Sequence, residues 1–332
     1  MRQGCTIEEL QAIWARLLKR SFIGPNENFF DLGGTPQLAT DLFREIAKNT
    51  GRELPSVLIF RVPTVSQMAT IFANTGEDPS CPVLLPFRQG GDKPAIFMAH
   101  GMGGDASQLF DVARQLRITN PIYLMQEPGI DGLSEPLSRI EDVAERYLGE
   151  IKKVQPQGPY LLIGYSFGGL VMMEIARRLR ERGDVVGFLA MLDTYPHRTH
   201  LSIRQQLPLL GRLAWRRLAS HARAFKARGQ RQQATSTLDK VRERIHSAES
   251  IAWRNYQPCF YQGRVCFVKA RVATYYPRNP RAVWGPLSSE FELHTVPGDH
   301  TALVSAQSNV VAQLLSAQLR KTDISVMRGT QS

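Results

Sequence analysis

The chain has 332 residues, of which 43% are apolar, and this is enough for one large or two unequal domains. It has no run of 18 apolar residues, and its first ten residues lack the apolar segment of a secretion signal, so we expect neither a membrane span nor export. The cysteines show no metal spacing and no paired framework, which favours reduced thiols in a cytoplasmic protein: Cys5, Cys81, Cys259 and Cys266.

The net charge of +11 lies almost wholly in one segment. Between His197 and Arg254 there are 13 Lys and Arg against 3 Asp and Glu. The segment has few aromatic residues to stack on bases and no nucleic-acid motif, which argues against nucleic-acid binding. A solvated helical face and a docking surface for an acidic partner both remain open.

Residues 1–75 are predicted to form a small helical domain. Thr6 offers an N-cap, followed by acidic residues and by an apolar face that includes Trp14. A second helix is expected from about Pro36 to Asn49, and a third begins near Thr64.

Residues 7–73 resemble an acyl or peptidyl carrier domain of nonribosomal peptide and polyketide synthases, through NENFFDLGG (26–34) and IFRVPTVSQMA (59–69). The resemblance implies that a serine bearing the phosphopantetheine arm should follow Gly34 by two positions. Pro36 stands there, and Thr35 is one position early. Thr35 and Pro36 are a good N-cap and first helical residue, so the helix survives while the nucleophile is lost. We expect a degenerate carrier without an arm, with modification of Thr35 as the alternative.

The segment 76–82 is a Gly- and Pro-containing linker, and 83–320 is predicted to be a second, α/β domain. Strands are expected within 83–101, at 121–125 and at 160–163, with helices at 105–117 and from Ile140. Strands and helices alternate, which indicates a mostly parallel sheet.

Gly164–Gly168 fits the G-x-S-x-G pattern of a nucleophile elbow, with an apolar strand before it and a helical pattern after it. This predicts that the Ser166 hydroxyl is exposed on a sharp turn. A glycine-rich loop, His100–Gly104, follows an earlier strand. Folds with a nucleophile elbow place one oxyanion donor in such a loop. The backbone amides of Met102 and Phe167 are therefore the candidate oxyanion hole.

Residues 94–320 resemble the type I thioesterase domain that terminates nonribosomal peptide and polyketide assembly lines. Four motifs carry the resemblance: MQEPGIDG (125–132), VQPQGPYLLIGYSFGG (154–169), LAMLDT (189–194) and VPGDHTALV (296–304). It implies an α/β-hydrolase fold with a mostly parallel central sheet and a helical lid. It also implies that Asp193, after the strand that follows the elbow, is the catalytic acid.

His300 is the expected base, because it follows the last predicted strand, 291–297, and the chain order in this fold is serine, acid, histidine. Four other residues are of the right type to be the catalytic acid or base: His100, Asp131, His294 and Asp299. We expect each of them to have a structural role or to point away from Ser166.

Residues 197–255 interrupt the hydrolase pattern with two apolar series at helical spacing, Leu207–Leu218 and Leu238–Ala252, joined by an expected mobile loop. In the resembled family this insertion is the lid, and its basic charge favours capture of an acidic carrier partner. A final helix is expected at about 301–320 and a disordered tail at 321–332.

The sequence thus predicts a thioesterase that forms an acyl-enzyme at Ser166. The acyl or peptidyl chain would arrive on the 4′-phosphopantetheine of a partner carrier protein or synthase, with no cofactor or metal bound in cis. Hydrolysis and cyclisation both remain open. So do two other classes, a serine esterase or amidase and a catalytically silent interaction protein.

Overall fold

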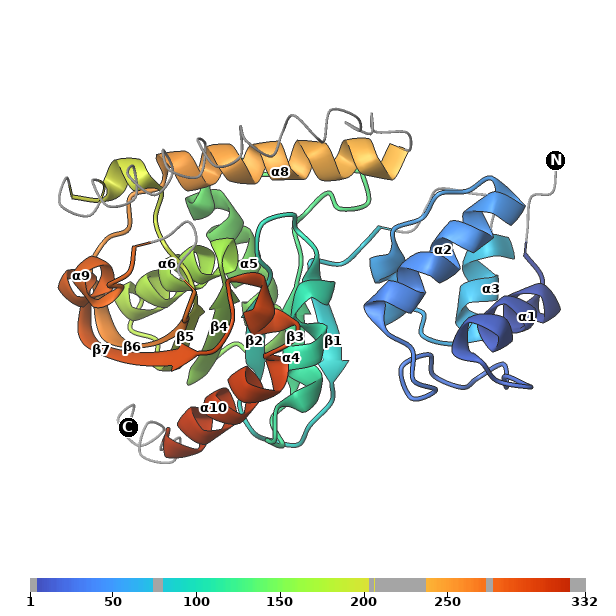
Figure 1. Cartoon of the computed structure of the whole chain (residues 1–332), viewed down its shortest axis with the longest axis horizontal. Coiled ribbons are helices and arrows are strands. Elements are labelled where there is room, and N and C mark those ends of the chain that lie inside the picture. The colour runs from blue at the N-terminus through green and yellow to red at the C-terminus, as the bar shows by residue number, and fades with distance from the viewer. Residues whose placement is uncertain (1–4, 74–79, 203–205, 207–236, 273–276, 323–332) are drawn as a thin grey trace.

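The computed structural model describes residues 5–73, 80–202, 206, 237–272 and 277–322 (Figure 1). These residues form a helical domain beside a larger domain built on a β-sheet. None of the described helices combines the length and the apolar composition that a bilayer crossing requires.

The helical domain contains α1 (Ile7–Leu18), α2 (Pro36–Thr50), the short 3₁₀ helix η1 (Ser56–Phe60) and α3 (Val65–Ala73). Thr6 and Glu9 cap α1 reciprocally, each side chain accepting from the other's backbone amide. The domain closes around the buried rings of Trp14 and Phe29, whose centroids lie 5.0 Å apart.

The described residues of the larger domain form a seven-stranded sheet in the order β1-β3-β2-β4-β5-β6-β7. Only β1 and β3 pair antiparallel, and the other five pairs are parallel. This confirms the predicted α/β fold with a mostly parallel sheet. The strands are β1 (Leu84–Arg88), β2 (Ile96–Ala99), β3 (Ile122–Met125), β4 (Tyr160–Tyr165), β5 (Val186–Leu192), β6 (Tyr261–Ala270) and β7 (Ser288–Val296).

Helices bury both faces of this sheet, because successive residues of a strand point to opposite sides. In β2, Ile96 and Met98 pack toward α4 (Phe110–Gln115) and α10 (Ser308–Lys321). Phe97 and Ala99 pack toward α5 (Ile140–Val154) and α6 (Phe167–Glu181).

Two predicted helices are interrupted. The helix expected at 105–117 begins as a 3₁₀ turn, η2 (Ala106–Leu109), because the Asp105 carboxylate accepts from the Ser107 amide, and α4 follows. The helix expected at 301–320 consists of η5 (Thr301–Val304) and α10, separated at Ser305, whose backbone is not helical. The apolar periodicity runs through both breaks, so it could not reveal them.

Part of the predicted lid is described, namely η3 (Arg198–His200) and the long helix α8 (Thr237–Asn255). The expected helix at Leu207–Leu218, most of the expected mobile loop and all but the start of the expected tail lie outside the described residues. The short helices α9 (Arg281–Trp284) and η4 (Gly285–Leu287) precede β7.

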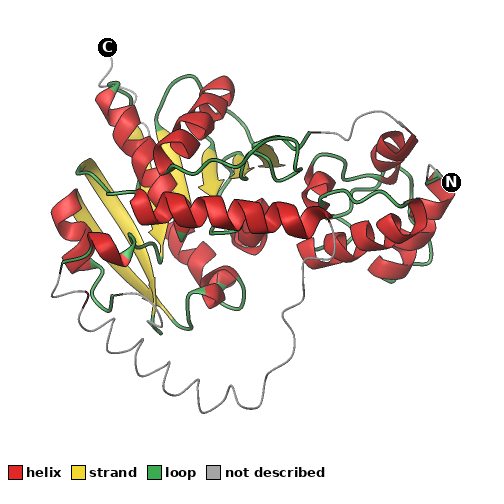
Figure 2. Ribbon diagram, turned by 90° about the horizontal axis from the view of Figure 1, so that it is seen from above, coloured by secondary structure: helices red, strands yellow, loops and turns green. Residues whose placement is uncertain are grey.

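The two domains meet through aromatic rings. Phe30 and Phe60 of the helical domain lie 5.1 and 6.1 Å, centroid to centroid, from Phe110 of α4. The helix α8 runs along the molecule until its Thr237 end reaches the helical domain (Figures 1 and 2), where the Thr237 amide donates to Glu53 at 3.0 Å. The helical domain therefore contacts both the sheet domain and α8.

The carboxyl group of Glu127 is buried inside the larger domain, and no cation among the described residues pairs with it. Glu127, just after β3, is 1% exposed, and its Oε1 accepts from the Leu137 amide at 3.3 Å. Among the described residues nothing bonds to its Oε2. Burial raises the pKa of Glu127 to about 8.

We predict that Phe110→Ala lowers the free energy of unfolding by about 3 kcal/mol, because it removes a buried ring at the junction of the two domains. Urea denaturation measures this loss. The control is Phe22→Ala, at a ring that is 71% exposed and should lose almost nothing. Equal effects of the two substitutions would contradict the described junction.

We also predict that the contribution of Glu127 to stability declines as the pH rises from about 4.5 to about 8, because folded Glu127 keeps a proton that the unfolded chain releases, whereas buried His100 acts in the opposite direction up to about pH 6.5. Glu127→Gln should reduce this slope and raise the melting temperature at pH 8. Glu249 shifts in the same direction, so some slope should remain. Thermal melts at several pH values test this, and an unchanged slope in the variant would refute it.

Candidate active site

Ser166 stands at the sharp turn between β4 and α6, with φ 53° and ψ −114°. This left-handed conformation is strained for a residue with a side chain, and such strain concentrates at functional sites. The flanking glycines allow the turn. A Cβ on Gly164 would lie 2.3 Å from the Gly168 carbonyl oxygen, and one on Gly168 would lie 2.2 Å from that of His100.

The structure brings Ser166, His300 and Asp193 together in one hydrogen-bonded chain. His300 Nε2 lies 3.0 Å from Ser166 Oγ, and His300 Nδ1 lies 2.9 Å from Asp193 Oδ2. If Nδ1 carries the ring proton and donates it to the carboxylate, Nε2 is free to accept the serine proton. The geometry suits nucleophilic catalysis.

Three further contacts, made by Ala270 and Tyr165, hold the acid and the histidine in place. Asp193, itself at φ 46° and 4% exposed, also accepts from the Ala270 amide through Oδ1 at 3.3 Å. The Tyr165 ring stacks on the His300 ring with centroids 4.8 Å apart, and its hydroxyl donates to the His300 carbonyl at 3.2 Å.

The two amides expected to form an oxyanion hole flank the serine. Phe167 is the first residue of α6, so its amide belongs to the unbonded first turn of the helix. Met102 lies in the loop after β2, between Gly101 and Gly103, whose amides donate to Gln108 and Glu249. Among the described residues, neither the Met102 nor the Phe167 amide has a recorded acceptor.

His100 is buried away from the serine. Its Nε2 lies 2.6 Å from the Tyr147 hydroxyl and its Nδ1 lies 2.6 Å from the Gly101 carbonyl oxygen. Burial lowers the pKa of His100 to about 4, so the ring stays neutral at physiological pH. Both ring nitrogens are engaged by neighbours other than Ser166.

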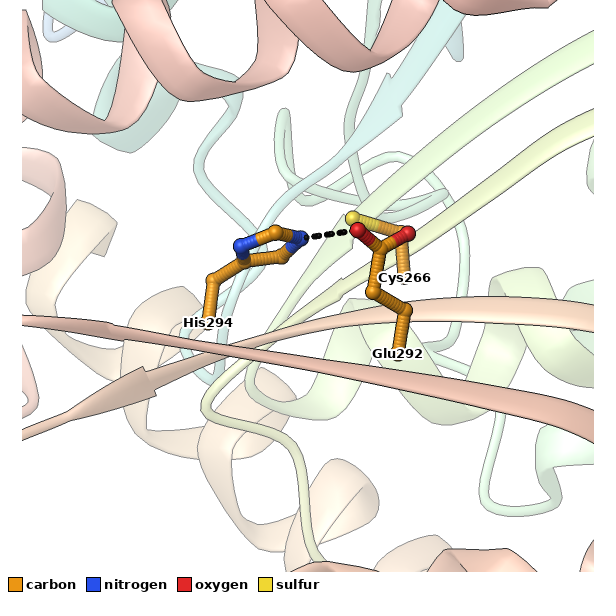
Figure 3. Close-up of side chains that lie close together, drawn as sticks. All are labelled: Cys266, Glu292 and His294. Atoms are coloured by element: carbon orange, nitrogen blue, oxygen red, sulfur yellow. Dashed lines mark ion pairs between the residues drawn. The ribbon is translucent and has the colours of Figure 1, made fainter.

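His294 lies on β7 in a separate polar group with Glu292 and Cys266 (Figure 3). His294 Nε2 is 2.9 Å from Glu292 Oε1, and Arg264 also bonds to Glu292. Burial raises the pKa of Cys266 to about 12, so its thiol keeps its proton. These contacts describe an ion-paired network between β6 and β7 and do not suit a metal.

The other two candidate acids, Asp131 and Asp299, accept hydrogen bonds from backbone amides. Asp131 accepts from the amides of Cys81 and Leu133, at 2.6 and 3.0 Å. Asp299 accepts from the Ala302 amide, and this hydrogen bond lowers the pKa of Asp299.

A cavity of about 600 Å³ opens in front of Ser166. Trp253 of α8 lines it, and the indole N–H donates to the Tyr195 carbonyl at 3.0 Å. Pro36 and Gln37, at the start of α2, also line it, so the helical domain contributes to the wall of this cavity.

Sequence reasoning missed three contributions to this site. Tyr165 occupies a variable position of the G-x-S-x-G pattern and Gln37 lies in the first turn of a helix, and neither pattern specifies a role for the side chain. Glu249 lies at the edge of the apolar face of α8, four residues after Ile245, and it is fully buried against the loop after β2. A carboxylate flanked by buried apolar positions, Ala248 and Ala252, was the available signal.

Comparison with protein families identifies two regions. Residues 94–319 match the thioesterase domain family, and residues 8–72 match the phosphopantetheine attachment site family. The first match spans more than half of the chain.

Curated relatives are much longer than this chain. A probable non-canonical nonribosomal peptide synthetase of Salinispora arenicola (strain CNS-205) is 37% identical over 61% of this chain and 3% of its own length. Malpibaldin synthetase of Mortierella alpina is 26% identical over 94% of this chain and 6% of its own length. Enterobactin synthase component F of Escherichia coli (strain K12) is 27% identical over 89% of this chain and 23% of its own length.

Solved structures share the fold. A four-domain nonribosomal peptide synthetase aligns over 96% of this chain and 26% of its own, with a TM-score of 0.61 and 23% identity. The thioesterase domain of NocB, from the nocardicin cluster, aligns over 68% of this chain and 95% of its own, with a TM-score of 0.54 and 21% identity. The chain therefore belongs to the thioesterase domain family, and its residues 8–72 match the phosphopantetheine attachment site family.

Proposed function

We propose that this protein releases an acyl or peptidyl chain from a phosphopantetheine thioester through an acyl-enzyme at Ser166, in nonribosomal peptide or polyketide biosynthesis. The observation that carries the proposal is the unbroken hydrogen-bonded chain from Ser166 through His300 to Asp193 at the floor of a cavity. The family membership of residues 94–319 supports it.

In the acylation step, Ser166 Oγ attacks the thioester carbonyl while His300 Nε2 takes its proton. Asp193 accepts from Nδ1–H and stabilises the imidazolium that forms. The carbonyl oxygen becomes an oxyanion that the Met102 and Phe167 amides can bind. Collapse of this intermediate breaks the carbon–sulfur bond, and the departing thiol takes the proton from His300.

In the second step, water or a nucleophile within the acyl chain attacks the ester on Ser166. His300 again accepts the proton of the attacking group and returns a proton to Ser166 Oγ. Water gives a free acid, and an internal amine or hydroxyl gives a ring.

The acyl chain arrives in trans in this proposal. Pro36 has no hydroxyl to carry an arm, and the Thr35 hydroxyl caps α2 by accepting from the Leu38 amide at 3.3 Å. The carrier-like domain then serves as a fixed wall of the cavity through Pro36 and Gln37. The partner is a carrier protein or synthase that presents the thioester.

A fluorophosphonate probe should add one adduct to the wild type, visible by intact mass, and none to Ser166→Ala. Turnover of an acyl thioester should fall by about 10⁴-fold or more in this variant. The matched control is Ser138→Ala, at an exposed serine, which should behave as the wild type. Turnover retained by Ser166→Ala would refute the assignment.

Incubation with coenzyme A and a promiscuous phosphopantetheinyl transferase should leave the mass of the wild type unchanged. Pro36→Ser should gain one phosphopantetheine, because it restores a hydroxyl at the expected position. A gain on the wild type that Thr35→Val abolishes would show that Thr35 carries the arm and would contradict delivery in trans.

A further inference from the structure

The loop after β2, Gly101–Gly104, is held on several sides. The Gly101 amide donates to Gln108 Oε1 at 2.9 Å, and Gln108 Nε2 donates to the Met102 carbonyl at 3.0 Å. The Glu127 amide donates to the Gly104 carbonyl at 3.0 Å. These partners all belong to the sheet domain itself.

A fourth bond comes from the lid helix α8. Glu249 Oε2 accepts from the Gly103 amide at 2.5 Å, across 146 positions of sequence. The neighbouring Ser250 hydroxyl approaches Met102 Sδ at 3.8 Å. The Glu249 turn of α8 therefore sits directly on the residue whose amide is expected to bind the oxyanion.

Glu249 is poorly placed for a purely stabilising role. Its side chain is fully buried, and no described group bonds to its Oε1, which lies 3.7 Å from His100 Nδ1. Burial and the nearby Glu127 carboxyl raise the pKa of Glu249 well above its usual value. An apolar residue of similar size would avoid the desolvation of this group.

The same side chains could suggest a metal site, since His100, Glu127 and Glu249 offer ligand atoms within 4.8 Å of one another. The His100 ring argues against it. Its two nitrogens already bond to the Gly101 carbonyl and the Tyr147 hydroxyl, both at 2.6 Å, so a metal would displace one of these contacts.

We propose that Glu249 is a positioning residue that fixes the Met102 amide in the oxyanion hole by holding the next amide, Gly103, from the lid helix. The lid helix and the catalytic loop are then one unit, and the oxyanion hole is complete only while α8 is seated. This inference rests on the proposed function of Ser166. An acceptor that reaches the Gly103 amide is required, and a negative charge is not.

The test compares three substitutions at one position by steady-state kinetics on an acyl thioester. Glu249→Gln keeps an oxygen within reach of the Gly103 amide and should retain kcat within about threefold. Glu249→Leu removes the acceptor and should lower kcat by about 10- to 100-fold, below the loss of a whole oxyanion donor, with KM changed less than about threefold. Glu249→Asp keeps the charge but is one methylene too short, and should resemble Leu.

The matched control is Glu243→Leu, the same substitution at an exposed position on the same helix, which should keep kcat. The rate of fluorophosphonate labelling should follow kcat through the series, because the phosphonyl oxygen occupies the same hole. Wild type that is not labelled at all would refute the proposed function, independently of Glu249.

A kcat in Glu249→Leu equal to that of the wild type would overturn the proposal. The proposal would also be overturned if Glu249→Asp retained activity and Glu249→Gln lost it, because that order would show that Glu249 acts through its charge. If the Leu variant does not fold, the comparison of Gln with Asp decides between these outcomes.

Discussion

The close approach of backbone at the Ser166 turn is the constraint on which the rest of the site depends. Gly164 and Gly168 have no room for a Cβ, so β4 and α6 pack almost directly against each other and against the end of β2. This contact leaves Ser166 in a left-handed conformation and exposes its hydroxyl. It also brings the Phe167 amide next to the loop that carries Met102. A side chain at either glycine would separate the nucleophile from its oxyanion donors.

The parallel sheet brings the other parts to the same edge. Tyr165 pairs with Leu192 and Leu192 with Val268, so β4, β5 and β6 reach the carboxyl edge of the sheet at one level. Asp193 leaves β5 there, and its amide donates to Val268 at 2.8 Å. His300 follows β7, the edge strand, and crosses back over the sheet to reach both Ser166 and Asp193. Loops at this edge of a parallel sheet are where such folds place ligands and catalysis.

The sequence predicted the fold class and the nucleophile turn because one is a pattern that recurs along the chain and the other is a local pattern, whereas Asp193 and the chain order of the three polar residues were implied by the resemblance to thioesterase domains and their fold. The periodicity of 105–117 and 301–320 could not show their breaks, since the apolar residues continue through both. Contacts that join distant segments had no local signal. Glu249 reaches Gly103 across 146 positions, and Pro36 meets the cavity because the helical domain packs on Phe110 through two aromatic rings and bonds to α8 through Glu53. These long-range contacts are also the ones that make this chain differ from a carrier domain linked to a thioesterase domain by a tether alone.

The proposed mechanism depends on one covalent intermediate, an acyl group on Ser166, and trapping that intermediate tests the mechanism directly. The protein would be mixed with an acyl thioester, quenched in acid within the first turnover and digested, and the modified peptide mapped by mass spectrometry. We expect an acyl ester on the peptide that contains Ser166, and this ester should decay as the free acid or the cyclic product appears. Product released in a full first turnover with no acyl peptide, or an acyl group on another residue, would contradict it.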